Sequence, residues 1–285
     1  MGVKVIEKGI LTSIQDKGRF GYAQLGVSQG GAMDRYSAKI ANLLVGNEAF
    51  KAVMEVTLLG PLLEFTKDAF IVLVGIEANI RLNGNEISLL KPFKVTRGDR
   101  LHIKQITKGA RLYLAIFGGF QTEVRLESRS QFFPITKTSS VKKGDLIAIS
   151  KNEGLKLVDF ASVKYKNKEL TSSVIEVFKG PEWDQVPSVL QEQILSTELT
   201  ISKNNSRMAY QLQEQFPNTL AGMLSQPVLP GTVQFTPDGN LIILMRDSQT
   251  TGGYPRIFQL TEDSINVLAQ KRQGDSLQLK LIDED

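Results

Sequence analysis

The 285-residue chain contains no cysteine. Disulfides, thiolate metal sites and a cysteine nucleophile are therefore excluded, and the composition fits a reducing compartment such as the cytoplasm. Histidine occurs once, at His102, so a zinc site built from histidine and cysteine is not expected either. His102 stands between Leu101 and Ile103 in an expected strand, a position more typical of a surface or wall residue than of a catalytic base.

Long apolar runs are also missing. The longest, Ala69–Ile76, is interrupted by Gly75 and is far too short to span a membrane. The first nine residues contain no apolar signal core. The net charge of +4 is mild. The lysines at 137–143 and 164–168 are interleaved with Thr, Ser, Asn and a single Tyr, which suits a solvated face better than a nucleic-acid groove with its denser charge and stacking aromatics. We therefore expect a soluble cytoplasmic protein that binds neither membranes nor nucleic acid.

Most of the chain has the pattern of short strands separated by turns. Asn83-Gly84 lies between alternating residues and predicts a β-hairpin. Gly98-Asp99, Gly144-Asp145 and Gly274-Asp275 each precede an alternating apolar strand. Helices are few, and the predicted ones lie near 34–45, 187–195 and 262–270. This pattern predicts a mainly β protein built from barrels or sandwiches.

A polar, lysine-rich segment, Lys151–Ser173, is the predicted divider between two β-rich lobes. The N-terminal lobe is expected to cover residues 1–160 and to carry the helix near 34–45. The C-terminal lobe is expected to cover residues 161–285.

The most informative stretch begins with five apolar residues, Leu241–Met245, which predict a buried strand. It continues into a loop of neutral hydrogen-bonding residues with an arginine at each end, Arg246 and Arg256. The adjacent glycines Gly252 and Gly253 can turn successive backbone N–H groups toward one point and form an anion-binding concavity. Arg256 can add a bidentate grip on a carboxylate or phosphate. The alternative is a tight hairpin between two strands.

Two other places repeat this chemistry in part. Ser128-Arg129-Ser130 follows a strongly apolar strand and the glycine pair Gly118-Gly119, so Arg129 and Ser130 are either ligand-binding or part of an exposed loop. Asp34 is expected to cap the helix that follows it, with a second possibility that its carboxylate faces a ligand.

Several familiar catalytic patterns are absent or misleading. No P-loop, dinucleotide-binding glycine fingerprint or HExxH motif occurs. Gly26-Val27-Ser28-Gln29-Gly30 matches the G-x-S-x-G nucleophile elbow, but the residues before Ser28 are polar and rich in glycine. Because the elbow needs a buried strand leading into the turn, a serine hydrolase is not expected.

Longer irregular motifs identify a family resemblance that covers almost the whole chain. The chain resembles the KipA family, also called allophanate hydrolase subunit 2, the biotin-dependent carboxyltransferase-like family or the C subunit of 5-oxoprolinase. The matching motifs are Thr12–Arg19, Gly30–Asp34, Ala41–Asn47, Glu55–Thr57, Gly60-Pro61, Gly118-Gly119, Ser128–Ser130, Gly180–Trp183 and Gln249–Ile257. Two positions differ from the family pattern: Ser28 replaces a usual proline, and Glu127 replaces a usual glycine.

The resemblance implies a cyclophilin-like β-barrel architecture and action beside two partners, a KipI-like protein and a LamB-like protein, which are the B and A subunits of 5-oxoprolinase. Such a complex opens 5-oxoproline to glutamate at the expense of ATP, with Mg²⁺ accompanying the nucleotide. The complex, and not necessarily this chain, would hold ATP. No metal ligand is assigned to this chain.

The resemblance also implies a set of site residues. Arg256 and Asp247 are the expected catalytic residues, with Asp247 as a general base or metal-side carboxylate, although a turn-capping aspartate is the alternative. The expected substrate-binding residues are Gln249, Thr250, Thr251, Gly252, Gly253 and Tyr254, with Arg129, Ser130 and Asp34 as a second wall.

Two other functions fit the same family. One is a carboxyltransferase that takes a carboxyl group from biotin; because no Ala-Met-Lys-Met acceptor site occurs, a partner would have to carry the biotin. The other is a non-catalytic regulator that binds a KipI-like kinase inhibitor and relieves its inhibition.

Overall fold

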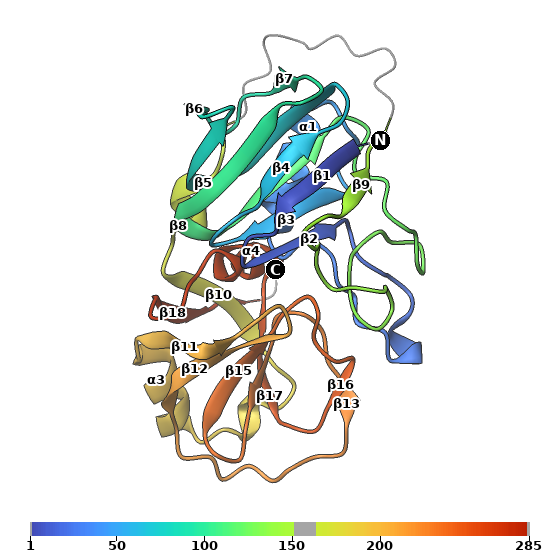
Figure 1. Cartoon of the computed structure of the whole chain (residues 1–285). Helices are drawn as coiled ribbons and strands as arrows, with labels where there is room; N and C mark the ends of the chain where they lie inside the picture. Colours follow the sequence, from blue (N-terminus) through green and yellow to red (C-terminus); the bar gives the residue numbers. More distant parts are fainter. Residues whose placement is uncertain (1, 151–163, 284–285) are drawn as a thin grey trace. The chain divides into compact units, whose positions relative to one another are not determined.

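The computed structural model describes residues 2–150 and 164–283 (Figure 1). The chain forms two compact units. Unit 1 comprises Met1–Arg19 and Gly30–Asn167, and unit 2 comprises Phe20–Gln29 and Lys168–Asp285. The boundary predicted at 160–161 lies outside the described residues. Both units are built mainly from strands, so the predicted mainly β class with two β-rich lobes and few short helices is confirmed.

Unit 1 is a nine-stranded sheet in which β2, β3, β8, β4, β1 and β9 lie side by side, and β5 pairs with β6, β7 and β8. The strands are β1 (Gly2–Glu7), β2 (Leu11–Gln15), β3 (Val53–Thr57), β4 (Leu62–Phe65), β5 (Ala69–Leu82), β6 (Asn85–Glu86), β7 (Phe93–Val95), β8 (Arg100–Ile116) and β9 (Leu146–Ala148).

The two longest strands of unit 1 were each expected as two shorter ones. The sequence predicts separate strands at 101–106 and 112–117, whereas β8 runs without a break and pairs with β5 along most of its length. The pairing shifts register at several points of β5, and Gly109 in β8 has a φ of 78°. Bulges of this kind interrupt the alternation of apolar residues without ending a strand. The Asn83-Gly84 hairpin is confirmed, with φ of 51° and 87° as a type I′ turn requires.

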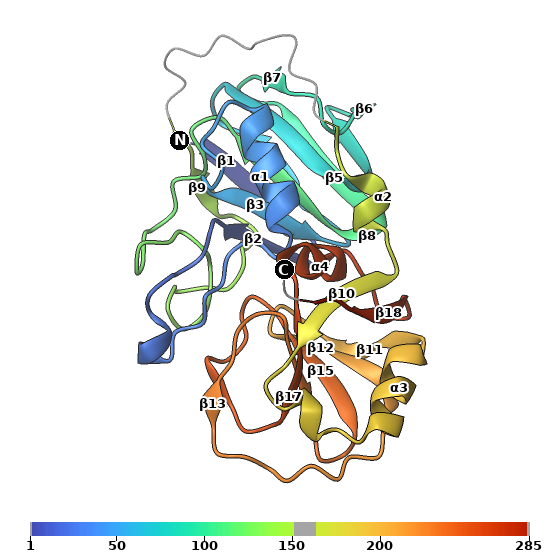
Figure 2. The ribbon, with the colours of Figure 1, turned by 180° about the vertical axis from the view of Figure 1, so that it is seen from behind.

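The predicted helix of unit 1 is α1 (Arg35–Leu44). Asp34 caps it, because its carboxylate accepts a hydrogen bond from Ser37 N at 2.9 Å. The helix packs on β5 and β8 and covers one face of the sheet (Figure 2). On the apolar side of the sheet, fully buried residues from β1, β3, β5 and β8 form the core, among them Val5, Met54, Leu73 and Leu114.

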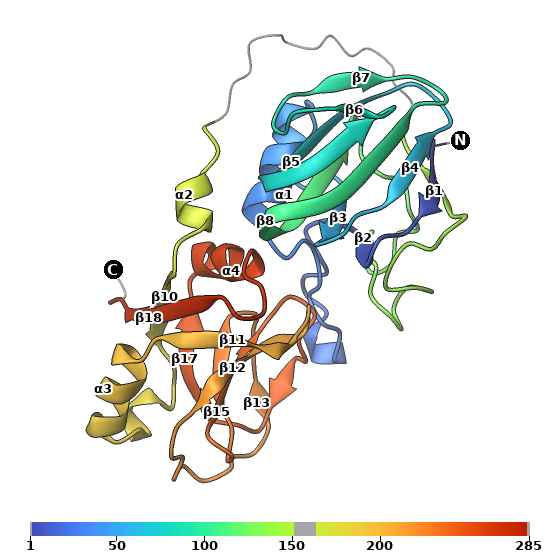
Figure 3. The ribbon, with the colours of Figure 1, turned by 60° about the vertical axis from the view of Figure 1, so that its left-hand side comes forward.

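Unit 2 contains a closed barrel, which confirms the barrel architecture expected from the resemblance. Its strand order is β10, β17, β14, β15, β12, β11, β18, and a parallel pairing of β10 with β18 closes it (Figure 3). The strands are β10 (Val174–Lys179), β11 (Leu199–Asn205), β12 (Ala209–Gln215), β14 (Thr232–Phe235), β15 (Asn240–Leu244), β17 (Arg256–Leu260) and β18 (Ser276–Leu281). Val233, Ile243 and Phe258 are among its fully buried residues.

Short helices and one small ladder complete the described structure. Two predicted helices are confirmed as α3 (Ser188–Ser196) and α4 (Glu262–Ala269), the latter capped by Thr261. The other elements are α2 (Asn167–Leu170), the 3-10 helices η1 (Ala23–Leu25) and η2 (Trp183–Gln185), and a two-stranded ladder of β13 (Gln226–Pro227) with β16 (Thr251–Gly252).

Candidate functional site

The loop singled out by the sequence, Arg246–Pro255, joins β15 to β17 in unit 2. Strand β14 lies between β15 and β17 and pairs with both, so the two strands are not paired with each other. The tight-hairpin alternative is therefore wrong. The loop instead pairs with the segment before β14: Val228 N donates to Thr250 O at 3.0 Å, Met223 N donates to Gly253 O at 3.2 Å, and β16 pairs with β13.

The two glycines of this loop do not form the expected anion-binding concavity. Such a nest alternates right-handed and left-handed residues, and neither Gly252 nor Gly253 has a left-handed φ. Gly252 serves a different purpose. A Cβ at this position would lie 2.3 Å from Nε2 of Gln234, so glycine lets the loop approach that side chain without displacing it.

Gln234 was not predicted from the sequence. It lies on β14 and is 2% exposed. Its Oε1 faces Nε2 of Gln249 at 3.4 Å, whereas its own Nε2 is buried and has no hydrogen-bond partner. In the sequence, Gln234 is a single polar residue between the apolar residues Val233 and Phe235. The structure shows that both of these neighbours are fully buried.

The guanidinium of Arg256 is held by Glu182 of the same unit. Nη2 and Nε of Arg256 donate to Oε1 and Oε2 of Glu182 at 2.8 and 3.0 Å, and Nη1 donates to Pro227 O at 3.0 Å. The hydrogen bonds from Arg256 lower the pKa of Glu182 from its usual value, and the hydrogen bond to Glu182 raises the pKa of Arg256. The predicted grip of Arg256 on a carboxylate is thus made within the chain.

Asp247 is also part of an ion pair. It is 7% exposed, and its two carboxylate oxygens accept hydrogen bonds from Nε and Nη2 of Arg207 at 2.7 and 2.9 Å. Asp247 N donates to Arg207 O at 2.9 Å. This bidentate geometry fixes both side chains relative to the turn that begins the loop.

The remaining predicted residues of the loop are more open. Gln249 and Thr251 are exposed, Tyr254 is 42% exposed, and Thr250 is half-buried. The side chains of this group therefore form the solvent-facing side of the loop, with Gln234 beneath it. Ser28 lies in the same unit, where its Oγ donates to Ser248 O at 2.6 Å and binds this loop as a structural residue.

In unit 1, Ser128-Arg129-Ser130 surrounds a carboxylate of the chain itself. Oδ1 of Asp16 accepts hydrogen bonds from Ser128 Oγ at 2.6 Å and Ser130 Oγ at 2.7 Å, and Oδ2 accepts one from Arg129 N at 2.6 Å. The Arg129 guanidinium donates to Thr122 O and to Gln121 Oε1. The polar groups at Arg129 and Ser130 are therefore used to hold the β2 end against this loop.

Asp34 belongs to a fully buried polar network. Oδ2 of Asp34 accepts a hydrogen bond from Ser37 Oγ at 2.5 Å, and this hydroxyl lies 2.6 Å from the Tyr165 hydroxyl. Asp34 N donates to the Tyr113 hydroxyl at 2.8 Å, which in turn donates to Glu55 Oε2 at 2.8 Å. Burial raises the pKa of both Tyr113 and Tyr165. The carboxylate of Asp34 acts as a helix cap inside the unit.

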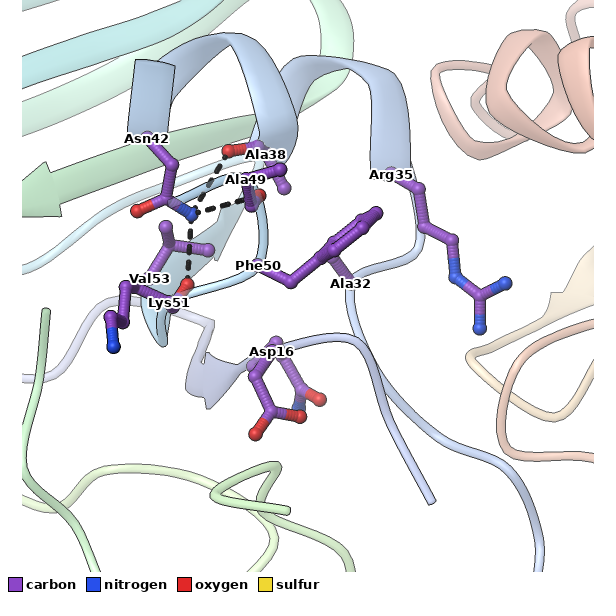
Figure 4. Close-up of a pocket in the computed structure, with 10 residues that line it drawn as sticks. Asp16, Ala32, Arg35, Ala38, Asn42, Ala49, Phe50, Lys51 and Val53 are labelled. Carbon is purple, nitrogen blue, oxygen red and sulfur yellow. Dashed lines mark hydrogen bonds between the residues drawn. The ribbon is translucent and has the colours of Figure 1, made fainter. Parts of the chain in front are cut away.

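A small pocket lies at the base of α1 in unit 1 (Figure 4). Its volume is about 10 Å³, which is room for roughly one water molecule. Asp16, Arg35 and Phe50 are among the lining residues, and Nδ2 of Asn42 donates to the carbonyl oxygens of Ala38, Ala49 and Lys51 (Figure 4). Only one water fits, so the pocket does not suit a substrate.

Metal ligands and membrane spans are not found in residues 2–150 and 164–283. This part of the chain contains no group of three or more histidine, cysteine, aspartate or glutamate residues arranged to hold a metal ion. Within the same ranges, no helix has the length and hydropathy needed to cross a membrane.

The arrangement of a nine-stranded sheet and a closed barrel has counterparts among known proteins. Residues 25–281 match the family described as the carboxyltransferase domain, subdomains A and B. The chain belongs to the carboxyltransferase domain family. The resemblance found in the sequence is thereby confirmed.

Curated relatives of this chain include proteins with two kinds of name. The chain is 34% identical over 274 residues to the C subunit of 5-oxoprolinase from Escherichia coli (strain K12), a match that covers 94% of this chain and 87% of that protein. It is 30% identical over 306 residues to urea amidolyase of Saccharomyces cerevisiae, a match that covers 97% of this chain but only 16% of the yeast protein.

Two solved structures are similar to this chain in fold. The K. lactis urea amidolyase matches with a TM-score of 0.88 and 27% identity over 99% of this chain and 19% of that protein. The protein TTHA0988 matches with a TM-score of 0.87 and 26% identity over 98% of this chain. This chain spans only 56% of TTHA0988, so both solved proteins contain further segments.

Proposed function

We propose that this chain is the C subunit of an ATP-dependent 5-oxoprolinase. The complex converts 5-oxo-L-proline, ATP and water to L-glutamate, ADP and phosphate. The observation that carries the proposal is the 34% identity to the corresponding E. coli protein, which extends over 87% of that protein. A relative named as one subunit implies that others exist, and we assign these roles to a KipI-like and a LamB-like protein in the cytoplasm.

Opening the lactam ring of 5-oxo-L-proline requires the protein to stabilise negative charge on oxygen. A lactam carbonyl is a poor electrophile, and transfer of a phosphoryl group from ATP to the amide oxygen makes the ring carbon reactive. Water then adds to that carbon and the ring C–N bond breaks as the nitrogen takes a proton, which gives an acyl phosphate of glutamate. A second water attacks the acyl carbon, and phosphate leaves with the former amide oxygen. Fixed N–H donors and guanidinium groups stabilise the oxyanions that develop in such steps.

The structure supports a division of roles among the predicted residues of unit 2. The substrate site is lined by the loop that carries Gln249, Thr250, Thr251, Gly252, Gly253 and Tyr254. Arg256 is preorganised by Glu182, and Asp247 fixes Arg207, so both members of these pairs act by positioning charge. Both carboxylate oxygens of Asp247 already accept N–H donors, which favours this role over proton abstraction.

We assign the predicted site residues of unit 1 a role in stabilising the fold and not in binding the substrate. Asp16 occupies the donors around Arg129 and Ser130, and the carboxylate of Asp34 is used as a helix cap. The described residues offer no acidic cluster for Mg²⁺. We therefore assign ATP and its Mg²⁺ to the assembled complex and route no step of the proposal through a metal bound by this chain.

The test is reconstitution. The chain is coexpressed with KipI-like and LamB-like proteins, 5-oxo-L-proline and ATP are supplied, and glutamate is measured with and without this chain. Glutamate formation should require the chain and should be lost with Arg256→Ala, while the complex still copurifies. Glutamate formation that is unchanged when the chain is omitted would remove the proposal.

A second function is favoured by one specific observation: 97% of this chain aligns with a segment of yeast urea amidolyase. On this alternative the chain transfers a carboxyl group from biotin carried by a partner to a urea-type acceptor. The same preparation distinguishes the two functions, because carboxylation would require a biotinylated partner and would proceed without 5-oxo-L-proline.

A further inference from the structure

One buried carboxamide in unit 2 has a hydrogen-bonding group that the described protein leaves unused. Gln234 is 2% exposed, and its Nε2 has no partner. Its Oε1 accepts from Nε2 of Gln249 at 3.4 Å. A buried N–H group without an acceptor destabilises the folded chain, so such a group in a native protein calls for an explanation.

Comparable carboxamides on the same barrel are satisfied. Gln211 on β12 is at the same level as Gln234, since both pair with Ile242 of the strand between them. Oε1 of Gln211 accepts from Asn204 Nδ2 at 2.9 Å, and its Nε2 donates to Asn240 Oδ1 at 3.1 Å. Gln259 on β17 likewise accepts from Thr232 Oγ1 and donates to Pro230 O at 2.9 Å. Gln234 therefore differs from its neighbours in having a free donor.

The free donor lies under the loop that the sequence singled out. Nε2 of Gln234 would be 2.3 Å from a Cβ at Gly252, so any residue other than glycine at this position would push the Gln234 carboxamide aside. The loop above it is held by the two-residue ladder of β13 with β16 and by the hydrogen bonds to Thr250 O and Gly253 O. Ser28 Oγ and Phe235 N also bind it, at Ser248 O and Pro255 O.

We propose that Nε2 of Gln234 donates a hydrogen bond to the carbonyl oxygen of a cyclic amide or ureido substrate bound beneath residues 249–252. A primary carboxamide matches this class of ligand, because its N–H donates to a carbonyl oxygen and its own oxygen accepts an N–H of the same amide group. A neutral donor in a dry setting also gives specificity, since a ligand without the carbonyl leaves the buried N–H unpaired. The inference rests on the proposed function and names the residue that recognises the lactam.

The decisive variants are Gln234→Met and Gln211→Met, assayed in the complex of this chain with its partner subunits. Methionine keeps the volume and removes the carboxamide. For Gln234→Met we expect KM for 5-oxo-L-proline to rise on the order of 10- to 100-fold, the effect of losing one hydrogen bond to a buried group. Its melting temperature should stay equal or rise, because an unsatisfied donor has been removed. Gln211→Met should leave KM unchanged.

Gly252→Ala provides an independent variant. The added methyl group would displace the Gln234 carboxamide, so KM should rise as in Gln234→Met, and the double variant should be no worse than either single one. A Gln234→Met chain that keeps the wild-type KM would overturn the inference and leave the 5-oxoprolinase function in place.

A different result would separate the two proposals. If the complex makes no glutamate, the proposed function is wrong, and the side-chain NH₂ resonance of Gln234 then decides the inference. This resonance is identified by its loss in Gln234→Met and is followed by NMR, with the partner subunits present, during titrations with 5-oxo-L-proline and with urea. A shift with either compound supports the carbonyl site, and the absence of a shift with both shows that Nε2 holds at most a water and overturns it.

Discussion

Nη2 of Arg256 lies 2.8 Å from Oε1 of Glu182, and the backbone N of Arg256 lies 2.8 Å from Oε2 of the same carboxylate. One side chain therefore fixes both the backbone and the guanidinium at the end of the loop. Glu182 is brought there by Gly180, where a Cβ would lie 2.1 Å from Arg256 O. The motif Gly180-Pro181-Glu182 is thus a support for Arg256.

The pH dependence of stability tests this support. The folded-state pKa of Glu182 is lowered from its usual value of 4.5 by Arg256. Its stabilising contribution is therefore complete above pH 4.5 and is lost as the pH falls through the lower folded-state pKa. In urea unfolding between neutral pH and the acid range, Glu182→Gln should lose less stability below pH 4.5 than the wild type. Glu176→Gln, which removes an exposed pair with Lys280, is the control and should follow the wild type. Parallel curves for the wild type and Glu182→Gln would contradict the prediction.

Gly180→Ala should destabilise unit 2 by about 2 kcal/mol or more, because the new methyl group would collide with backbone atoms that cannot move independently. Gly222→Ala is the matched control, since nothing lies within 4 Å of a Cβ there and φ is not left-handed. The free energy of unfolding of each variant, measured by urea titration, checks the difference. Equal stability of the two variants would show that the chain around Gly180 relaxes.

Asp16→Asn should cost about 1–3 kcal/mol of stability. Asparagine keeps an oxygen for the hydrogen bonds that Oδ1 receives from Gly18, Ser128 and Ser130, but its amide nitrogen replaces Oδ2 and meets Arg129 N, a second donor. Asp145→Asn is the control, since the Asp145 side chain accepts one exposed hydrogen bond, from Lys142 N. Chemical unfolding followed by circular dichroism measures both. A loss for Asp16→Asn no larger than that for Asp145→Asn would mean that solvent replaces the carboxylate at the loop.

The two buried tyrosines Tyr113 and Tyr165 should ionise only at a pH above that of a free tyrosine. Of the six tyrosines, Tyr113 and Tyr165 have a pKa raised by burial above the usual value of 10.0. Their contribution to stability is complete below pH 10.0 and is lost as the pH rises above it, because only the unfolded chain then releases these protons. In an ultraviolet titration of the folded chain, the phenols of Tyr113 and Tyr165 should ionise above pH 10.0, and Tyr113→Phe should remove one of these two ionisations. Simultaneous ionisation of every phenol before unfolding would contradict the burial of Tyr113.

Glu127→Gly should stabilise unit 1 by about 0.5–1 kcal/mol, because Glu127 has a φ of 60°, a conformation that costs a residue with a Cβ more than it costs glycine. This position is where the family pattern usually has glycine. The turn hydrogen bonds between Arg125 and Ser128 should remain. A melting temperature below that of the wild type would show that the Glu127 side chain contributes more than its backbone strain.

Local signals predicted the elements that depend on neighbouring residues. Asp34 and Gly46 flank the helix that forms at Arg35–Leu44, and Asn83-Gly84 forms the predicted turn. The sequence did not reveal that β14 would lie between β15 and β17, because strand order depends on contacts between residues far apart in the chain. That order made the hairpin interpretation of Thr250–Arg256 wrong.

The partners of the candidate site residues were also not predictable from the sequence. The sequence singled out Asp247, Arg256, Arg129 and Ser130 as polar residues free to meet a ligand. Each of them instead has a partner within the chain, at Arg207, Glu182, Gln121 and Asp16 respectively. The sequence shows that a buried charged side chain needs a partner, but it does not show which residue of the chain or which ligand is that partner. Gln234 escaped notice because a single glutamine in a strand becomes informative only when its burial and missing partner are known.

Residues Phe20–Gln29 precede nearly all of unit 1 in the chain but belong to unit 2, where Ser28 binds Ser248 O. A cut between the units near residue 168 would therefore separate the barrel from a segment of its own unit. Dissection of this protein into autonomous halves should yield a C-terminal fragment with a loosened 246–256 loop, and a complementing peptide spanning 20–29 would be needed to restore it. During synthesis the same segment has to wait for more than two hundred later residues before its binding partner emerges from the ribosome.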